Sequence, residues 1–373
     1  MTQHPFPPAR QEVENLQAYS APLEGRRGLL RLDFNENTIG PSPKVVEAIR
    51  TIPADHIAIY PEYDGLREAV VANLGLPLSP DQIGLFNGVD AAIHAIFHAY
   101  GECGDTLLTT SPTFGYYVPC ARMQGMGIEA IPYEGPQFSF PLAAIRRTLV
   151  DEPWPRLLLI CNPNNPTGTR LAPQVILDLA AAAPHTLVVV DELYEAFTGD
   201  SVLPVADFAA TPNLVVLRSL AKTAGLAGLR IGFAIGAAPV IDRISRVTGP
   251  YDINSFAVTA ALAALADQPY TDAYVTEVLR ARDWLLTRLQ TAAVRHHAAG
   301  GNYLLIWPEA PAALVERRLR EVGILVRSMA GKPLIEGSLR VSVGTIEQMQ
   351  RFWAAFQAAD RPGVGSAELS ASP

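Results

Sequence analysis

No segment of this 373-residue sequence is apolar enough to cross a membrane. A spanning helix needs about 20 apolar residues in succession, and no stretch approaches that length. Residues 1–10 lack the apolar core of a secretory signal peptide, so we expect none. The sequence also lacks a basic run or a stripe of basic and aromatic residues, and its formal net charge is −8. We therefore expect neither a membrane nor a nucleic acid as a partner.

Cysteine is scarce, and the three cysteines, Cys103, Cys120 and Cys161, are far apart. An odd and scattered set predicts neither a disulfide framework nor a zinc site, and it favours reduced thiols in a cytoplasmic protein. His94 and His98 are four residues apart on an expected helix, a spacing that could hold a metal ion. No third ligand is indicated near them in the sequence, so we expect no metal site.

Hydrophobic residues, by contrast, make up 49% of a chain long enough for a large core and a second domain. From residue 83 onward, short apolar runs alternate with helical patterns, and runs such as Leu157–Cys161 are continuously apolar, as in strands buried on both faces. The alternation predicts an α/β fold, in which helices flank a mostly parallel, seven-stranded sheet and a smaller α+β domain follows. The expected strands span residues 83–86, 106–110, 128–131, 157–161, 187–190, 214–217 and 231–235.

The predicted domain boundaries follow from a change in composition near residue 255. We assign residues 1–34 to an N-terminal arm and part of the small domain, 35–255 to the large domain, 256–359 to the small domain and 360–373 to a polar tail. Residues 256–292 are rich in Ala, Leu and Arg and predict long helices. Further strands or helices are expected over residues 29–34, 44–50, 303–307, 314–321, 324–327, 339–343 and 348–358.

The stretch SLAKTAGLAGLR, residues 219–230, contains a single lysine, Lys222, just after a predicted strand and before a Gly-rich loop. Ligand chemistry in α/β proteins is placed at such strand ends. A lysine there can form a Schiff base with a carbonyl cofactor, of which pyridoxal phosphate is the commonest. A lysine considered alone would more often be an exposed loop residue.

Other strand ends supply groups that suit the same cofactor. Asp191 follows a buried strand, where a carboxylate needs a partner such as a protonated pyridine nitrogen. Tyr194, three residues later, and Asn165, in the rigid turn NPNNPTG, can hydrogen-bond the ring's O3′. Phe114, in SPTFGYY, is placed to stack on the ring. The alternatives are a helix cap for Asp191 and ordinary core packing for the two aromatic residues.

An anion site is predicted where the turn at Gly88 opens a helix. The free backbone N–H groups of Val89 and Asp90, together with the helix dipole, favour a phosphate there. Ser219 and Arg230 would complete the site with a hydroxyl and a guanidinium. A glycine before a helix is alone only a turn signal, so this prediction depends on the neighbouring motifs.

Two arginines lie on predicted strands of the second domain. Arg340, in GSLRVSVGT, is a cation in a largely apolar strand, which indicates an anionic ligand such as a substrate carboxylate or phosphate. Arg327 ends the preceding strand. For Arg327 the alternative of a salt bridge at the domain edge is the stronger one.

In their order along the chain, these motifs resemble a known family. The order NEN…GPSP, YP, NG-x-D, SPTFGYY, NPNNPTG, DELY, S-x-x-K…GLR and LRVSVGT is similar to that of the fold-type-I pyridoxal-phosphate-dependent aminotransferases, and most similar to the histidinol-phosphate aminotransferase branch. The resemblance covers residues 19–358. NPNNPTG together with SLAKTAGLAGLR is specific, whereas any one motif would not be.

The resemblance implies that Lys222 carries pyridoxal phosphate as a covalent aldimine and that Asp191 and Tyr194 act with it in catalysis. Asp191 would pair with the pyridine nitrogen, while Asn165 and Tyr194 would bind O3′. The implied ligands of the phosphate and ring face are Val89, Asp90, Ser219, Arg230 and Phe114.

The resemblance also implies a homodimer, because Tyr60 matches a residue that such enzymes lend to the neighbouring subunit's site. Arg340 matches the arginine that grips the substrate's carboxylate or phosphate. The remaining residues assigned to substrate binding are Tyr19, Asn37, Tyr251, Asn254 and Arg327.

The sequence departs from the family pattern at three positions. Ala221 and Val89 stand where serine is common, and Thr38 replaces the usual proline after NEN. The first two changes remove hydroxyls near the phosphate but no backbone donors, so pyridoxal phosphate remains the expected cofactor.

The predicted function is amino transfer from histidinol phosphate, with 2-oxoglutarate and glutamate as the second pair. The partners are then a small-molecule amine and a 2-oxo acid. The alternative is an aromatic amino acid aminotransferase acting on phenylalanine or tyrosine. More distant alternatives are a pyridoxal-phosphate-dependent lyase or decarboxylase, or a non-catalytic protein that binds the cofactor.

Overall fold

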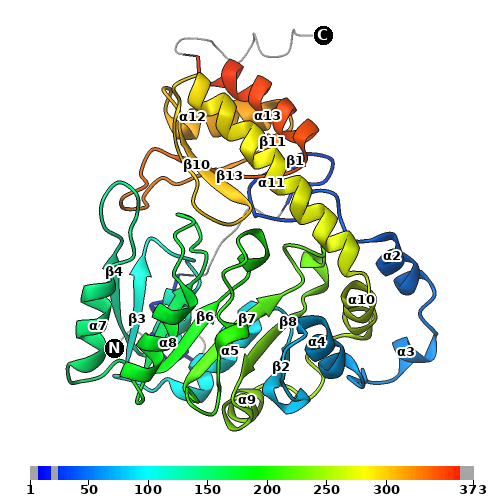
Figure 1. Ribbon diagram of the computed structural model, residues 1–373, viewed down its shortest axis with the longest axis vertical. Helices are drawn as coiled ribbons and strands as arrows, with labels where there is room; N and C mark the ends of the chain where they lie inside the picture. The colour runs from blue at the N-terminus through cyan, green and yellow to red at the C-terminus, as the bar shows by residue number, and fades with distance from the viewer. Residues whose placement is uncertain (1–6, 18–23, 362–373) are drawn as a thin grey trace.

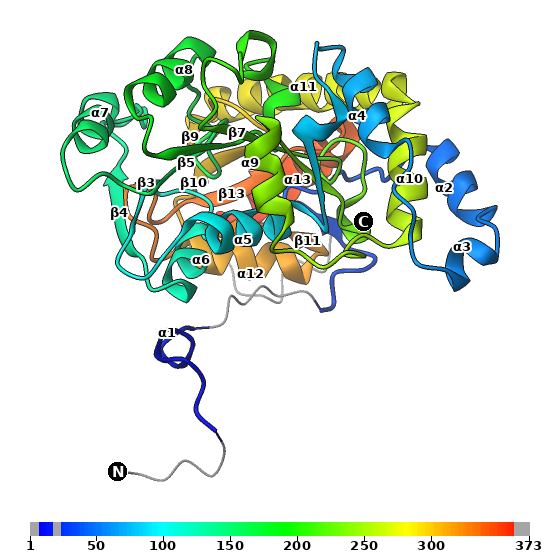
Figure 2. The same cartoon turned by 90° about the horizontal axis from the view of Figure 1, so that it is seen from below.

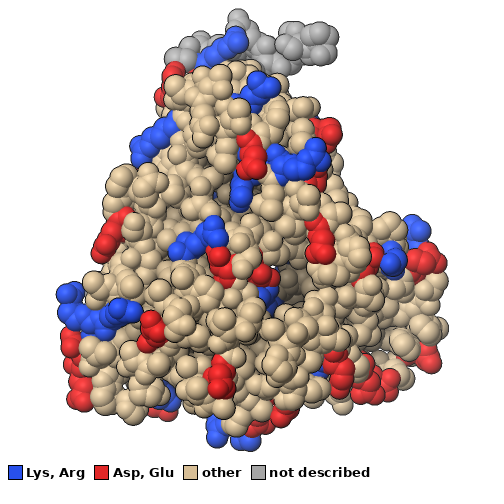
Figure 3. All heavy atoms as spheres, in the orientation of Figure 1, with Lys and Arg blue, Asp and Glu red and all other residues tan. Residues whose placement is uncertain are grey.

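The computed structural model describes residues 7–17 and 24–361 of the chain. Figure 1 shows two parts, a larger one around a central sheet and a smaller one around a second sheet near the C-terminus. None of the helices in the described ranges combines the length and the apolar character that a membrane-spanning helix requires. On the face drawn in Figure 3, basic and acidic side chains are interspersed rather than gathered into a patch of one sign.

The large sheet has seven strands in the order β2-β8-β7-β6-β5-β3-β4. Strand β8 runs antiparallel to both of its neighbours, and the other neighbouring pairs are parallel. This confirms the predicted mostly parallel α/β fold. The strands are β2 (Ile83–Phe86), β3 (Thr106–Ser111), β4 (Gly127–Pro132), β5 (Leu157–Cys161), β6 (Leu187–Asp191), β7 (Leu214–Ser219) and β8 (Gly232–Gly236).

Helices cover both faces of this sheet, which is why its central strands β5 and β6 are apolar at consecutive positions up to Asp191. Along β6, Val188 and Val190 pack into one hydrophobic cluster, whereas Val189 packs into another on the opposite face. Figure 2 shows α7 and α8 on one side of the sheet and α5 and α6 on the other. Ile241 and Ile244 of α9 pack into the same hydrophobic cluster as α5. These helices are α5 (Val89–Tyr100), α6 (Tyr117–Met123), α7 (Leu142–Val150), α8 (Pro173–Ala182) and α9 (Ala238–Ser245).

The small sheet is antiparallel, in the order β12-β13-β10-β9. Its strands are β9 (Arg295–His297), β10 (Tyr303–Trp307), β12 (Arg327–Ser328) and β13 (Leu339–Ser342), with α11 (Gln268–Thr291), α12 (Ala312–Glu321) and α13 (Ile346–Ala359) beside them. Strand β1 (Leu30–Arg31) pairs in parallel with β11 (Ile324–Leu325). The segment before the large sheet thus pairs with a strand from the C-terminal part of the chain, and the domain assignment stays a prediction.

The remaining helices connect these layers. Ser42 caps α2 by accepting a hydrogen bond from the backbone N–H of Val45, and Pro43 occupies its first turn. The other elements are α1 (Gln11–Glu14), α2 (Pro43–Arg50), α3 (Asp55–Ala58), α4 (Leu66–Leu74), α10 (Ser255–Leu265) and the short 3-10 helices Pro80–Gln82, Glu195–Phe197, Leu203–Val205 and Ala227–Leu229.

One predicted strand differs in the structure. Residues 324–327 were expected to form a single strand, but β11 ends at Leu325 and β12 begins at Arg327. The two strands belong to different sheets, β11 beside β1 and β12 beside β13. The chain passes from one sheet to the other at Val326, and this residue is buried. The apolar run therefore continues through the change of sheet, and the sequence gives no signal of it.

Candidate active site

A cavity of about 120 Å³ lies at the carboxyl ends of the central strands β5, β6 and β7. Nine of the ten side chains predicted to contact the cofactor line it, and Tyr60 is the exception. Three further residues line it that the sequence did not single out as ligands. The lining consists of Val89, Asp90, Phe114, Asn165, Asp191, Tyr194, Ser219, Lys222 and Arg230, with Cys161, Leu193 and Ala221 in addition.

Lys222 follows β7 and reaches into this cavity. Its Nζ donates a hydrogen bond of 3.0 Å to the backbone carbonyl of Phe34 and lies 6.0 Å from the centre of the Tyr194 ring. Burial lowers the pKa of Lys222 to about 8, and the positive charge of Arg340 acts in the same direction. About a tenth of the amine is therefore uncharged at pH 7, a far larger share than for an ordinary lysine, and able to act as a nucleophile or base.

Asp191 is the last residue of β6, and two donors hold its carboxylate. Oδ2 accepts a hydrogen bond of 2.6 Å from the Tyr117 hydroxyl, and Oδ1 accepts one of 3.2 Å from the backbone N–H of Leu193. Burial raises the pKa of Asp191 to about 6, although the bond from Tyr117 acts in the opposite direction. The carboxylate is thus mostly ionised at neutral pH, and a cation in the cavity would bring its raised pKa back down.

Tyr194 lies at the centre of an amide network. Its hydroxyl accepts hydrogen bonds of 3.2 Å from Asn165 Nδ2 and 3.1 Å from Asn35 Nδ2. Arg340 Nη1 donates to Asn165 Oδ1 at 2.7 Å, which fixes the orientation of that amide. Burial raises the pKa of Tyr194 well above its usual range, so the phenol stays protonated. Asn35 was not among the predicted residues, although it begins the NEN motif.

The start of α5 forms a concave backbone surface that depends on two glycines. A Cβ on Gly88 would lie 2.6 Å from Arg230 Nη2, and a Cβ on Gly232 would lie 2.6 Å from the backbone nitrogen of Val89. Both glycines therefore leave room around the first N–H groups of the helix. Arg230 Nη2 donates to Asp90 Oδ2 at 2.8 Å, so a guanidinium lies beside this helix end. These groups lie together at the position where the sequence predicts an anion site.

Phe114 and Ser219 also line the cavity. The Phe114 ring packs edge-on against Tyr117, with centroids 5.4 Å apart. Ser219 Oγ donates to the backbone carbonyl of Ile231 at 3.2 Å and accepts from the backbone N–H of Ala221 at 3.1 Å. The serine hydroxyl thus orders the turn that leads to Lys222.

Arg340 and Arg327 bring two guanidinium groups to the same sheet. Arg340 is buried and donates to the backbone carbonyl of Asp33 as well as to Asn165. Arg327 is half-buried, and its guanidinium carbon lies 5.4 Å from the centre of the Phe34 ring. Within residues 7–17 and 24–361, Arg327 makes no salt bridge, so the domain-edge ion pair that the sequence left open is not seen there.

Tyr60 and Tyr251 do not line this cavity. Both are exposed, 71% and 52% respectively, and their rings stack on each other with centroids 4.2 Å apart. Ile57 and Ile59 are exposed beside Tyr60 in the sequence, at 60% and 50%. These aromatic and aliphatic side chains thus lie on the surface of the chain.

Asn254 and Asn37, both predicted to bind substrate, form side-chain hydrogen bonds with the backbone. Asn254 caps α10 by accepting a hydrogen bond of 2.9 Å from the backbone N–H of Ala257. Asn37 donates to the backbone carbonyl of Thr223 at 2.8 Å, which ties the NEN segment to the residue after Lys222. Tyr19 lies outside the residues that the structure describes.

His94, one of the two histidines whose spacing could hold a metal ion, makes another contact. His94 Nε2 is hydrogen-bonded to the Tyr116 hydroxyl, and burial lowers the pKa of that histidine. In the described part of the chain, no group of three or more His, Cys, Asp or Glu side chains is arranged to hold a metal ion.

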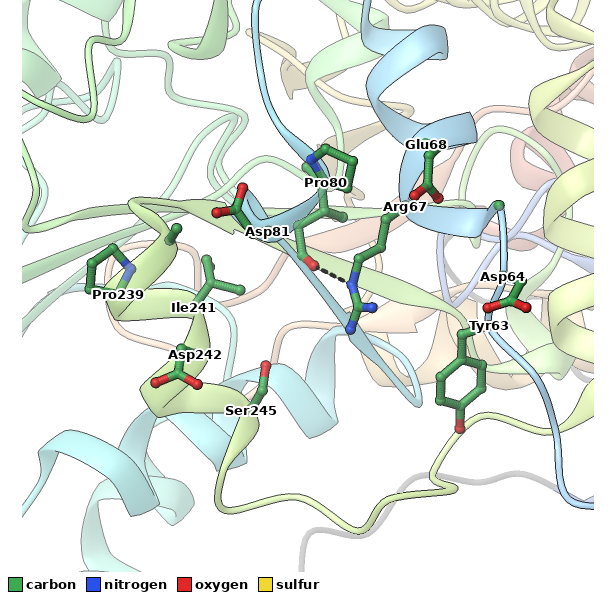
Figure 4. A pocket seen from close by; sticks show the side chains of 13 residues that line it. Tyr63, Asp64, Arg67, Glu68, Pro80, Asp81, Pro239, Ile241, Asp242 and Ser245 are labelled. Carbon is green, nitrogen blue, oxygen red and sulfur yellow. Dashed lines mark hydrogen bonds between the residues drawn. The ribbon is translucent and has the colours of Figure 1, made fainter.

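A larger cavity, of about 700 Å³, lies elsewhere on the large domain and is shown in Figure 4. It is bounded by the start of α4, the beginning of β2 and the helix that follows β8, so it lies at the edge of the sheet away from Lys222. Its one guanidinium, Arg67, is bound through Nε to the carbonyl of Ile83 at 3.0 Å. None of the predicted cofactor residues lines this cavity.

Comparison with known proteins agrees with this arrangement. A histidinol-phosphate aminotransferase from Moorella thermoacetica is 31% identical over 368 residues, covering 94% of this chain and 92% of that protein. One from Symbiobacterium thermophilum is 35% identical over 347 residues, covering 90% and 91%. The crystal structure of histidinol-phosphate aminotransferase from Sinorhizobium meliloti in complex with pyridoxal 5'-phosphate has the same fold, with a TM-score of 0.84 at 24% identity over 95% of this chain and 98% of that chain.

Residues 27–356 match the family described as aminotransferase class I and II. This match spans both sheets and every residue that lines the cavity. The chain therefore belongs to the aminotransferase class I and II family.

Proposed function

We propose that this aminotransferase acts on histidinol phosphate, uses 2-oxoglutarate and glutamate as its second pair, and holds pyridoxal phosphate covalently through Lys222. The relatives from Moorella and Symbiobacterium are both named histidinol-phosphate aminotransferases. The observation that carries the proposal is the pair of guanidinium groups, Arg327 and Arg340, which lie opposite each other on adjacent strands. Arg340 donates to Asn165, which lines the Lys222 cavity.

The residues of the cavity fit pyridoxal phosphate. The N–H groups at the start of α5, with Arg230 and Ser219, would hold the phosphate, and Asp191 would face the pyridine nitrogen. Asn165 and Tyr194 would bind the ring hydroxyl. Bound pyridoxal phosphate supplies the electron sink that makes the Cα–H bond of an attached amine acidic.

Lys222 would then act as the base that moves the Cα proton. Its pKa of about 8 places the neutral amine within reach at physiological pH, where a base is most effective. The carboxylate of Asp191 would keep the pyridine nitrogen protonated. A buried ion pair is favoured over two neutral partners only when its charged groups are well hydrogen-bonded. The Asp191 carboxylate meets this condition, because Tyr117 and the N–H of Leu193 both donate to it.

Arg327 and Arg340 favour a phosphorylated substrate over an aromatic one. Like charges directly opposite each other on antiparallel strands are destabilising unless an anion lies between them. A phosphate dianion accepts several charge-assisted hydrogen bonds and suits two guanidiniums, whereas one arginine is sufficient for a carboxylate. Arg340 would therefore serve both substrates, and Arg327 would serve the phosphate.

We further propose a cytoplasmic homodimer in which Tyr60 reaches the neighbouring subunit's site. The exposure of Tyr60, Tyr251, Ile57 and Ile59 supports an interface on this surface, since large apolar groups left on one subunit are typical of contact regions. Three free cysteines, two of them buried, favour a reducing compartment.

A donor panel tests the function. Purified enzyme is mixed with 2-oxoglutarate and, in turn, L-histidinol phosphate, phenylalanine, tyrosine and aspartate, and glutamate formation is measured. Histidinol phosphate should give the highest kcat/KM. Borohydride reduction followed by peptide mapping should place the cofactor on Lys222, and label on another lysine would contradict the assignment.

A further inference from the structure

Tyr117 contacts two of the residues that would hold the cofactor ring, and it is not needed as a ligand itself. It opens α6 and is fully buried. Its hydroxyl donates to Asp191 Oδ2 at 2.6 Å, and its ring packs against Phe114 with centroids 5.4 Å apart at an angle of 77°. One side chain therefore joins the group expected under the pyridine nitrogen to the group expected on the ring face.

We propose that Tyr117 is a positioning residue that holds the Asp191 carboxylate ionised and aimed into the cavity. The inference rests on the proposed binding of pyridoxal phosphate between Phe114 and Asp191. With Oδ2 bound by Tyr117 and Oδ1 bound by the N–H of Leu193, both carboxylate oxygens have a donor and the carboxylate plane is fixed. A free carboxylate at a strand end would instead rotate about its Cβ–Cγ bond.

The direction of the hydrogen bond is set by burial. The pKa of Tyr117 lies well above its usual value because the phenol is desolvated, so the hydroxyl keeps its proton and donates. A carboxylate that accepts such a bond holds its negative charge more strongly. Asp191 and the pyridine nitrogen compete for one proton, and the donor to Asp191 shifts that proton toward the ring.

The other titratable groups near Asp191 do not replace Tyr117 as the donor. Cys161 pairs with Asp191 in register on β5, and burial raises the pKa of its thiol, so it stays neutral. Asp90 is paired with Arg230, and Lys222 is hydrogen-bonded to the carbonyl of Phe34. The hydrogen bond to the Asp191 carboxylate thus comes from the neutral hydroxyl of Tyr117.

The test is Tyr117→Phe, which removes the hydroxyl and keeps the ring. Infrared titration of the protonated carboxyl in the cofactor-free protein, with Asp191→Asn as the reference, should show the Asp191 midpoint rising by roughly one pH unit. With ¹⁵N-labelled pyridoxal phosphate bound, the nitrogen resonance should move toward that of neutral pyridine. The kcat should fall about tenfold with a smaller change in KM.

Tyr133→Phe is the matched control. Tyr133 is also buried, but its hydroxyl accepts from Thr110 at 3.1 Å instead of contacting Asp191. The control should leave the carboxyl midpoint and the nitrogen resonance unchanged. In an Asp191→Asn background, Tyr117→Phe should cause no further shift of the nitrogen resonance, because the partner of the bond is gone.

An unchanged midpoint in Tyr117→Phe, or an equal shift in Tyr133→Phe, would overturn the inference. If Tyr117→Phe does not fold, site-specific 3-fluorotyrosine at position 117 keeps the hydroxyl, strengthens it as a donor and should lower the midpoint instead. A wild-type protein that fails to bind pyridoxal phosphate would refute the proposed function. The titration of the cofactor-free protein would still decide whether Tyr117 controls Asp191.

Discussion

Arg327 and Arg340 lie directly opposite each other on the antiparallel strands β12 and β13. The two side chains therefore share one face of the small sheet, although both are positively charged. Arg340 is fixed by Asn165 and by the carbonyl of Asp33, while Arg327 contacts the Phe34 ring and has no salt bridge among the described residues. Arg327 is thus the more available of the two cations for an anionic substrate group.

Replacing Arg327 should discriminate between the two candidate substrates. In Arg327→Ala, kcat/KM for L-histidinol phosphate should fall at least tenfold, because each charge-assisted hydrogen bond to the phosphate contributes about 1.5–3 kcal/mol. The value for phenylalanine should change little, since an aromatic side chain offers Arg327 no anion. Steady-state kinetics with both donors measures the difference.

Arg317→Ala is the control for this experiment. Arg317 is an exposed arginine on α12 that lines the same surface cavity as Arg327, of about 450 Å³. Its removal changes the net charge equally and should leave both kcat/KM values unchanged. If the wild-type enzyme prefers phenylalanine or tyrosine to histidinol phosphate, the proposed substrate is wrong and the aromatic aminotransferase is the better assignment.

Lys222 should make the stability of the cofactor-free protein depend on pH. Its pKa is about 8 in the folded protein and 10.5 in the reference state, so the unfolded chain binds more protons between these values. The folded protein is therefore destabilised by Lys222 below about pH 8, by at most about 3 kcal/mol, and the destabilisation disappears as the pH rises above the unfolded pKa.

Lys222→Met should consequently raise the free energy of unfolding at pH 7 and have little effect near pH 10.5, as measured by urea denaturation of the cofactor-free protein. The same variant should lose transamination by several orders of magnitude, because no other amine lines the cavity. A difference in stability that does not vary with pH would show that Lys222 is not desolvated in solution.

Asp191 should respond differently to two substitutions. Asp191→Ala removes the carboxylate that would keep the pyridine nitrogen protonated. The kcat should therefore fall by roughly two or more orders of magnitude, which is the usual effect of losing a strong electrostatic partner in a buried site. Asp191→Glu keeps the charge and should retain part of the activity. Near-normal turnover in the alanine variant would contradict the proposed role.

The large sheet could be predicted from the sequence because its central strands contain continuous apolar runs, such as residues 157–161 in β5 and 187–190 in β6. Strand β9 was missed because its residues, Arg295–His297, are polar and show no apolar alternation. The break at Val326 was also invisible, since a change of strand partner leaves the hydrophobic pattern intact. Local hydrophobic patterns therefore predict the helix and sheet layers of the fold, but they do not predict the edge strands of the small sheet.

The site could be predicted where a motif carries its own chemistry, as for Lys222 and Asp191. Asn35 and Tyr117 were not identified, because their roles depend on partners far away in the sequence. Asn35 is bound to Tyr194, 159 positions later, and Tyr117 to Asp191, 74 positions later. Asn254 caps α10, a contact that was not predicted from the sequence, and its binding of substrate stays a prediction.

A homodimer with shared sites is the expected state in solution. Light scattering at micromolar concentration should give about twice the chain mass of 40.2 kDa. The exposed pair Tyr60 and Tyr251 should become protected from solvent in the dimer, which hydrogen exchange or tyrosine iodination can measure. A fully active monomer would refute the shared site.

Mixing two inactive variants tests directly whether Tyr60 serves the neighbouring subunit. Tyr60→Ala keeps Lys222, and Lys222→Ala keeps Tyr60, so each homodimer lacks one group at both of its sites. In a hybrid dimer, one site combines Lys222 of the first chain with Tyr60 of the second and is complete, while the other site lacks both groups. Random reassortment should therefore restore about a quarter of the wild-type sites, since half of the dimers are hybrids with one intact site. If Tyr60 acted within its own subunit, hybrids would contain no intact site, and mixing would restore nothing beyond the residual activity of Tyr60→Ala.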